Sequence, residues 1–384
     1  MKKYRLSASI IFIILILVSI FSFTDCNRQP QKEKEKAILK IGVILPLTGP
    51  LNYRGQEEKK AMELAMQDFN QKHADASITL IFKDSNSRSL EAITDNLINT
   101  ERVSAFMAST APVSRAISYI ANNKKIIMGF LTSDSTIQKL SPYIFRLSMS
   151  QEAEAYQIAS YFAGENKAEQ IVVLFANQPQ ISRQITDYLI PKFTQSNINI
   201  SFYEPYASWQ INFKETVERI EHSRATSLLI LGFKEEYGPI LEELARRKLT
   251  GRIKIVSGIN LLSLENLSSE LFEGTIIAAP QYVFDKNERA KAFEQRFLNV
   301  CGHTPGLEAA FAYDAVSVLS EGLVDGLVSG HGNAETVSFK TTNRKYEGVM
   351  GDIAIDNEGG LSVPMGMGVI KKGKIVPLSN TEKH

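Results

Sequence analysis

Two turns of this sequence combine hydroxyl side chains with small residues in a way that could hold a polar ligand. They are Ala108-Ser109-Thr110 and Leu131-Thr132-Ser133. Each comes at the end of a short apolar run that is typical of a buried strand. Hydroxyls and backbone amides at the start of a helix can bind a carboxylate or another polar head group. The same residues could instead be ordinary helix N-caps, and both interpretations stay open at this point.

A third candidate region is the stretch Leu39–Asn70, which begins with the apolar run Leu39–Leu45. Prolines and a glycine interrupt regular structure after this run, and from Tyr53 onward apolar residues recur with helical spacing. Strand, loop and amphipathic helix form the first half of a βαβ unit, whose ligands lie beyond the carboxyl ends of the strands. Tyr53 is therefore a further candidate ligand contact beside the two hydroxyl turns.

Signatures of catalysis and of cofactor binding are missing from the sequence. It contains no Gly-x-Gly-x-x-Gly after a strand, no phosphate-binding Gly-Lys-Ser/Thr loop and no Gly-x-Ser-x-Gly elbow. The five histidines are scattered among polar neighbours and lack the spacing of metal ligands. Cys301 is a lone thiol, which is more often structural than reactive. We expect no cofactor, no metal and no catalytic activity.

The overall composition describes an ordinary soluble protein of two domains. At 384 residues the chain is long for a single core, and 44% hydrophobic and 22% charged residues are typical of globular proteins. A net charge of +1 argues against a nucleic-acid partner, which requires a concentrated basic field. The two cysteines, Cys26 and Cys301, are too few for a disulfide framework.

The N-terminus resembles a targeting segment. Basic residues at positions 2, 3 and 5 precede the apolar run Ile10–Phe23, which has the length of a secretory h-region. Cys26 follows at the place where a bacterial lipoprotein carries its lipid, although Asp25 is unusual before such a cysteine. We predict a signal peptide over residues 1–25, lipid attachment at Cys26 and a polar tether over residues 26–37. An uncleaved anchor, or cleavage at another bond, is the alternative.

Strand and helix patterns alternate along the rest of the chain. Strands are predicted at 39–45, 77–83, 103–107, 125–130, 143–147, 170–175, 198–203, 226–231, 253–256, 275–279, 351–355 and 366–370. Helices are predicted at 53–70, 90–98, 113–122, 152–163, 181–193, 213–221, 237–248, 288–299 and 308–326. This alternation indicates an α/β protein with two mostly parallel sheets, and the break between them falls near 147–151.

Several segments together resemble the type I periplasmic binding proteins, and in particular the branched-chain amino-acid (Leu/Ile/Val) binding group. The resemblance covers residues 39–376, and its most specific part is Tyr346–Asp356 with Gly359 after it. Further matching segments are Ile41–Gly49 with Tyr53, Asp84 at a strand end, Tyr143–Arg146 and Ala312–Ala315.

The resemblance implies two Rossmann-like lobes with parallel sheets, joined by three crossover segments, that close like a hinge on a small ligand. It assigns residues 38–148 and 281–364 to lobe 1, and residues 149–280 and 365–384 to lobe 2. It implies a ligand site made of Tyr53, Ala108, Ser109, Thr110, Leu131, Thr132, Ser133, Phe233 and Asn260. The implied partners are a small-molecule ligand and the membrane permease of an ABC transporter, and the protein is expected to act as a monomer.

Three departures from the family pattern concern the ligand. Lys60 replaces a usual glycine, and an aromatic turn is missing around Gln178–Ser182. Ser257–Asn260 lacks the acidic residue that pairs with the ammonium of an amino acid in many relatives. Burying an unpaired ammonium costs several kcal/mol, whereas a micromolar ligand has about 8 kcal/mol of binding free energy in total. Glu235 or Glu236 could supply this negative charge. The candidate ligands are therefore an amino acid, an amide or a carboxylate.

The sequence therefore predicts a secreted, lipid-anchored solute-binding protein of the periplasm or cell envelope, which performs no chemistry. Three alternatives remain open. The chain could be a ligand-sensing or regulatory module of the same fold that acts on a partner protein. It could be a scaffold whose cleft has lost its ligand. It could also be an α/β enzyme without the usual signatures.

Overall fold

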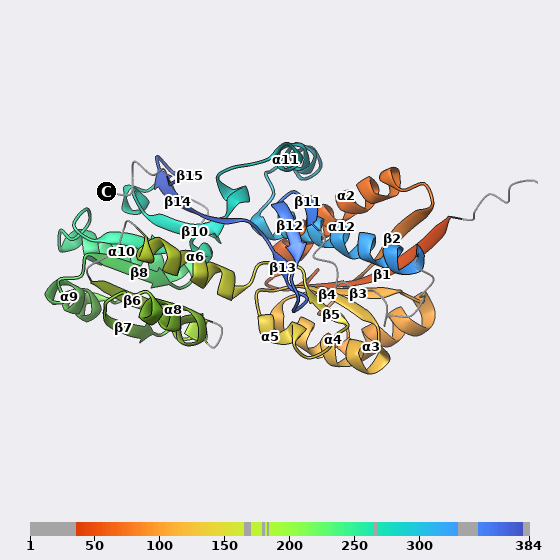
Figure 1. Ribbon diagram of the computed structural model, residues 1–384, viewed down its shortest axis with the longest axis horizontal. Coiled ribbons are helices and arrows are strands. Elements are labelled where there is room, and N and C mark those ends of the chain that lie inside the picture. The colour runs from red at the N-terminus through yellow and green to blue at the C-terminus, as the bar shows by residue number, and fades with distance from the viewer. Residues whose placement is uncertain are drawn as a thin grey trace, which may run out of the picture.

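The computed structural model describes residues 36–164, 170–178, 181–182, 184–263, 267–328 and 345–378. Within these ranges the chain forms two lobes that lie side by side along the long axis of the molecule (Figure 1). The predicted signal peptide, Cys26 and most of the predicted tether lie outside the described residues. In the described part of the chain, no helix combines the length and apolarity that crossing a membrane requires.

The first lobe is built on a parallel sheet of five strands in the order β2-β1-β3-β4-β5. The strands are β1 (Ala37–Leu45), β2 (Ala76–Asp84), β3 (Ala105–Ser109), β4 (Ile127–Leu131) and β5 (Ile144–Arg146). They alternate with α2 (Asn52–Lys72), α3 (Leu90–Asp95), the π-helical turn η1 (Asn96–Glu101), α4 (Ala111–Lys124) and α5 (Ser135–Gln138). The middle strands β3 and β4 are buried throughout, and apolar except for Ser109, because helices cover both faces of the sheet.

Two later helices return to the first lobe and complete its core. These are α11 (Glu288–Cys301) and α12 (Leu307–Val328), whose buried aromatic residues belong to the same hydrophobic cluster as β1. A small antiparallel sheet follows, formed by β11 (Lys345–Gly348), β12 (Gly351–Ile355) and β13 (Leu361–Ser362). Asp314 of α12 stabilises the tight turn between β11 and β12, because its carboxylate accepts the N–H groups of Val349 and Met350, both at 2.8 Å.

The second lobe contains a sheet of seven strands in the order β15-β14-β10-β9-β8-β6-β7. The parallel strands are β6 (Ile171–Ala176), β7 (Ile200–Tyr206), β8 (Ser227–Leu231), β9 (Lys254–Ser257) and β10 (Ile276–Pro280), and the antiparallel ones are β14 (Met365–Lys371) and β15 (Lys374–Pro377). Its helices are α6 (Gln151–Ala163), η2 (Gln184–Leu189), α8 (Ile190–Gln195), α9 (Lys214–His222) and α10 (Lys234–Arg246), with short turns η3 (Ile259–Ser263), η4 (Glu270–Phe272) and η5 (Gln281–Val283).

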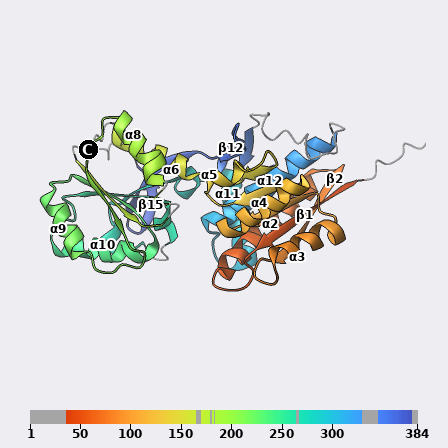
Figure 2. The same ribbon diagram turned by 90° about the horizontal axis from the view of Figure 1, so that it is seen from below.

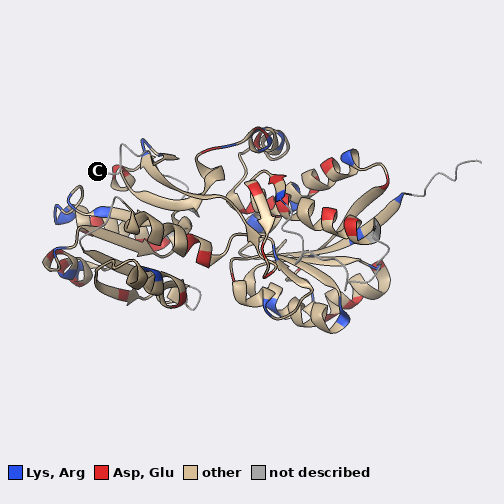
Figure 3. Cartoon of the chain, in the orientation of Figure 1, with Lys and Arg blue, Asp and Glu red and all other residues tan. Residues whose placement is uncertain are grey.

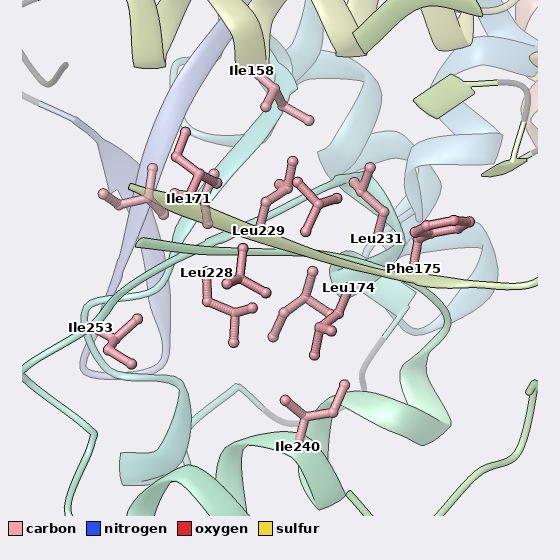
Figure 4. Close-up of a cluster of buried hydrophobic side chains, with 14 of the residues drawn as sticks. Ile158, Ile171, Leu174, Phe175, Leu228, Leu229, Leu231, Ile240 and Ile253 are labelled. Atoms are coloured by element: carbon pink, nitrogen blue, oxygen red, sulfur yellow. The ribbon is translucent and has the colours of Figure 1, made fainter. Parts of the chain in front are cut away.

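The core of the second lobe shows how this sheet is covered on both faces. Ile158 of α6 approaches it from one side and Ile240 of α10 from the other, while Leu174 and Leu229 project from the strands between them (Figure 4). All four side chains are fully buried. The prediction of two α/β lobes with mostly parallel sheets is thereby confirmed.

The chain passes between the two lobes three times: after β5, after β10 and after β13. Arg146 joins the first and third passages, since its buried guanidinium donates to the carbonyl oxygens of Ser148 and Leu361. It also donates to Gln138 Oε1 at 2.9 Å, and burial lowers the pKa of Arg146 to about 10. This arginine therefore holds the first and third connecting segments together.

Three short strands were not predicted from the sequence. β11 and β13 have four and two residues, which is too few for an alternating pattern to be recognised, and β15 is a partly exposed edge strand. The segment predicted as one helix over 181–193 contains the π-helical turn η2 followed by α8. Pro191, near the start of α8, lacks the N–H that a continuous helix would use.

Candidate ligand-binding site

The two hydroxyl turns lie next to each other at the carboxyl edge of the first sheet. β3 and β4 are hydrogen-bonded neighbours, and Ser109 is in register with Leu131 at their ends. Thr110, Thr132 and Ser133 follow directly and are half-exposed. The first turn of α2 closes over this edge, because Arg54 Nη2 donates to the Leu131 carbonyl oxygen at 3.1 Å. We name Tyr53, Ala108–Thr110 and Leu131–Ser133 the first half-site.

The hydroxyls of the first half-site are not used as helix N-caps. Thr110 precedes α4 without a side-chain capping bond, and the N-cap of α5 is Asp134, not Ser133. Thr110 has a φ of 67°, a backbone conformation that costs of order 1–3 kcal/mol for such a residue and is often found at functional sites. Tyr53 is 68% exposed, whereas Ser109 is fully buried and turns its hydroxyl inward.

A buried ion pair that the sequence analysis missed supports the first half-site from behind. Arg54 Nε donates to Glu58 Oε1 at 2.8 Å, and the Ser109 hydroxyl donates to the same oxygen at 3.0 Å. Glu58 is completely buried, and the Arg54 side chain is 27% exposed. Burial raises the pKa of Glu58 despite these two partners. Burial alone would lower the pKa of Arg54, but attraction to Glu58 and Glu308 outweighs it and raises this pKa.

A pocket opens at the corresponding edge of the second sheet. It is a small, partly open pocket of about 10 Å³, which is room for about one water molecule, and it lies past the ends of β8 and β9. The lining residues come from five segments of the second lobe: Glu154, Ile181, Gln184, Leu231, Gly232, Tyr237, Gly258 and Asn260. Of the two predicted second-lobe contacts, Asn260 lines this pocket, whereas Phe233 is 37% exposed beside it and is not part of the lining. We name these eight lining residues the second half-site.

Glu154 is the charged residue of the second half-site, and the sequence analysis did not select it. Its side chain is 5% exposed and accepts the Ile259 N–H at 2.5 Å and the Gln184 Nε2 at 2.6 Å. A Cβ atom at position 258 would collide with this carboxylate, so Gly258 provides the room for it. Burial raises the pKa of Glu154, and the two hydrogen bonds oppose this shift.

The two glutamates proposed from the sequence as charge donors have other positions. Glu236 is buried, and its two carboxylate oxygens accept the backbone N–H groups of Phe233 at 2.7 Å and Trp209 at 3.0 Å. It therefore holds the start of α10 and the loop after β7 in place. Glu235 is half-exposed on the first turn of α10 and is not among the residues that line the pocket.

Direct contacts join the two lobes. The hydroxyls of Ser135 in the first lobe and Tyr188 in the second lie 3.2 Å apart. Ile259 of the second lobe packs its side chain against the core of the first. Figures 1 and 2 both place α6, which carries Glu154, at the end of the second lobe that faces the first. Such contacts are compatible with hinge motion about the three connections.

Comparison with known proteins identifies the fold. A family model described as "Periplasmic binding protein" matches residues 38–374, nearly the whole described chain. The chain belongs to this family. The Leu/Ile/Val-binding protein of Citrobacter freundii is 21% identical over 336 residues, which cover 84% of this chain and 88% of that protein.

Two solved structures of periplasmic binding proteins have the same fold as this chain. A solute-binding protein of an ABC transporter from Rhodopseudomonas palustris BisB5, in complex with 3,4-dihydroxybenzoic acid, has a TM-score of 0.72 at 19% identity and covers 89% of this chain and 96% of its own. A branched-chain amino-acid binding protein from Streptococcus pneumoniae, in complex with isoleucine, has a TM-score of 0.68 at 18% identity and covers 88% and 97%. At these identities the likeness concerns the fold alone.

Charged residues of both signs occur in both lobes. In the part of the chain that the structure describes, lysines and arginines are interspersed with aspartates and glutamates along the helices (Figure 3). Among the described residues, no group of three or more histidine, cysteine, aspartate or glutamate side chains is arranged to hold a metal ion.

Proposed function

We propose that this periplasmic binding protein captures a small polar solute between its lobes and delivers it to the permease of an ABC transporter. One observation carries the proposal: the strands of each lobe end in a polar half-site, and the lobes touch through Ser135 and Tyr188, which are close in sequence to Ser133 and Gln184 of these half-sites. A ligand of open parallel sheets lies at such strand ends. The half-sites are compatible with a ligand that is held by both lobes at once.

The proposal includes the division of the chain and the first contacts of the ligand. Lobe 1 comprises residues 38–148 and 281–364, and lobe 2 comprises residues 149–280 and 365–384. Thr110, Thr132 and Ser133 then hold the carboxylate or another polar head group of the ligand through hydroxyls and backbone amides, with Tyr53 against its body. Each such hydrogen bond to a charged group contributes about 1.5–3 kcal/mol.

Mass spectrometry of the native protein tests this function. We expect a small molecule to co-purify, and we expect calorimetry to measure its affinity after the ligand has been removed by unfolding and refolding. Closure of the lobes on that molecule should reduce the radius of gyration in small-angle X-ray scattering. A protein that carries no small molecule, and that binds none of a panel of amino acids, amides and aromatic carboxylates, would contradict the proposal.

The location of the protein in the cell envelope forms a separate part of the proposal. We expect the chain to be exported and anchored by a lipid on Cys26, with residues 26–37 as tether. Cys26→Ser should abolish labelling by a radioactive fatty acid and move the protein from the membrane fraction to the soluble fraction. Cys301→Ser is the matched control and should leave both unchanged. Membrane association that survives Cys26→Ser would indicate an uncleaved anchor instead.

A further inference from the structure

We propose that Glu154 is the ligand-facing charge of the second half-site and that it selects a solute with an ammonium or similar cationic group. The inference rests on the proposed function and narrows its ligand class. It assigns the role of ammonium partner to a residue on the first helix of the second lobe. In this proposal, neither the segment Ser257–Asn260 nor the glutamates at the start of α10 bind the ammonium group.

The position of Glu154 places its carboxylate where a ligand between the lobes would lie. α6 begins directly after the first passage between the lobes, and Glu154 is the fourth residue of this helix. The carboxylate lines the pocket at the ends of β8 and β9. Ile259, whose N–H it accepts, packs its own side chain against the core of the first lobe. Glu154 is thus at the inner wall of the second lobe.

The hydrogen bonds of Glu154 leave its negative charge unbalanced. Both donors, the Ile259 N–H and the Gln184 amide, are neutral. None of the ion pairs among the described residues includes Glu154, whereas Glu58 of the first lobe is paired with Arg54. A buried carboxylate without a cation is unfavourable, and each of its oxygens can accept a second hydrogen bond. An ammonium group in the pocket would supply both the charge and the donors.

The other nearby acidic side chains fit this role less well. Both carboxylate oxygens of Glu236 accept backbone N–H groups, and the side chain is buried against the loop after β7. Glu235 is half-exposed and is not among the lining residues. A benzoate-type ligand brings only a carboxylate and an aromatic ring, so it would leave the charge of Glu154 unpaired. The geometry therefore favours an amine over an aromatic acid.

Glu154→Gln tests the inference, because the amide keeps the size of the side chain and one acceptor oxygen while it removes the charge. The probes are pairs of compounds that differ by one ammonium group: L-leucine with 4-methylpentanoate, and L-phenylalanine with 3-phenylpropanoate. Putrescine, glycine betaine and benzoate complete the panel. Affinities are measured by calorimetry on the full mature chain. Glu235→Gln is the matched control, since it removes a neighbouring charge that does not line the pocket.

The expected result is selective. The wild-type protein should bind at least one amine of the panel, and the amine member of a pair at least about tenfold more tightly than its amine-free partner. Glu154→Gln should weaken the amine by about 30-fold or more, as the loss of one partner of a buried charge pair does, and should leave the amine-free compound within a few-fold. Glu235→Gln should change neither.

Three results would overturn the inference. The first is equal binding of both members of a pair by the wild type. The second is an equal loss for both members in Glu154→Gln, which would indicate a purely structural role. The third is binding of benzoate with no amine bound at all. In all three cases a bound solute still supports the proposed function, whereas a protein that binds nothing in the panel and carries no co-purified molecule fails both.

Discussion

The first helices of the two lobes, α2 and α6, each carry a buried glutamate one turn before their apolar stripe. In α2 this residue is Glu58, which precedes Met62, and in α6 it is Glu154, which precedes Ile158. Glu58 is neutralised within the lobe by Arg54 and also binds the Ser109 hydroxyl. Glu154 receives only neutral donors and lines an open pocket.

The difference between Glu58 and Glu154 suggests that the first residue contributes to the stability of the protein and the second to ligand binding. A buried ion pair whose partners are both inside the protein is costly to break, because removal of one partner leaves the other charge uncompensated. A buried carboxylate that lacks an internal cation lowers the stability of the empty protein and leaves its charge available to a ligand. We therefore expect changes at Glu58 to appear in unfolding experiments and changes at Glu154 to appear in binding experiments.

Arg54→Met would break the internal pair of the first lobe and should have the largest effect on stability. It leaves the Glu58 carboxylate buried without a cation, which costs about 3–5 kcal/mol of the free energy of unfolding. Urea unfolding followed by circular dichroism measures this loss. The double variant Arg54→Met/Glu58→Leu should recover most of it, since no charge then remains buried. A single variant within about 1 kcal/mol of wild type would show that the pair is a weak surface interaction.

Ser133→Ala examines the hydroxyls of the first half-site. We expect the affinity for the co-purified ligand to fall by roughly ten- to a hundredfold, which corresponds to the loss of one hydrogen bond to a charged group. The melting temperature should stay nearly unchanged, because Ser133 does not cap α5.

Asp134→Ala provides the opposite control for Ser133→Ala. Asp134 accepts the Thr136 N–H at 3.1 Å as the N-cap of α5 and also pairs with Arg115 at 2.6 Å, so its loss should cost at least about 1 kcal/mol of stability and leave the affinity unchanged. Calorimetry and thermal unfolding of both variants distinguish the two roles. Unaltered affinity together with a lowered melting temperature in Ser133→Ala would remove this residue from the site.

The smallest expected effect is the pH dependence of stability at Glu154. Burial raises the pKa of this carboxyl in the folded protein, so its contribution to stability is full below the unfolded pKa and is lost as the pH rises through the folded pKa. The titratable side chain that interacts with it is Tyr237 of α10, which stays neutral over this range because burial raises its pKa.

Glu154→Gln cannot ionise and therefore avoids this loss. Without ligand, the variant should melt at a higher temperature than wild type at pH 8, and the difference should shrink towards pH 4. Differential scanning calorimetry of the ligand-free proteins measures the trend. A difference that grows as the pH falls would mean that the ionised form of Glu154 is already well stabilised inside the protein.

The fold could be predicted from the sequence because its signals are local and repeated. β3 and β4 are short apolar runs that end in hydroxyl turns, and they are neighbours in the sheet, with Ser109 opposite Leu131. The positions of Thr110, Thr132 and Ser133 at one edge follow from this parallel arrangement. Asn260 lies at the edge of the second sheet for the same reason.

The charges at the site could not be predicted in the same way. Glu154 lies in the first turn of α6, where acidic residues are normally solvated and favourable, and Glu58 lies in the second turn of α2 among other charged residues. Their burial depends on which face of α2 and α6 packs against a sheet, and the only local signal is a glutamate in register with the apolar stripe. The ion pair of Arg54 and the role of Gly258 depend on distant segments, so only the assembled structure reveals them.

The second lobe cannot complete its sheet until the C-terminal part of the chain has been synthesised. β10 ends at Pro280, but the strand that pairs with its outer edge, β14, begins only at Met365, after the chain has completed the first lobe. A nascent chain that has not yet reached β14 leaves β10 as an open edge, and Arg146 lacks its acceptor on Leu361. We expect such a chain to remain incompletely folded until its last residues have been synthesised. In the export proposed above, this late closure would keep the chain unfolded while it crosses the membrane.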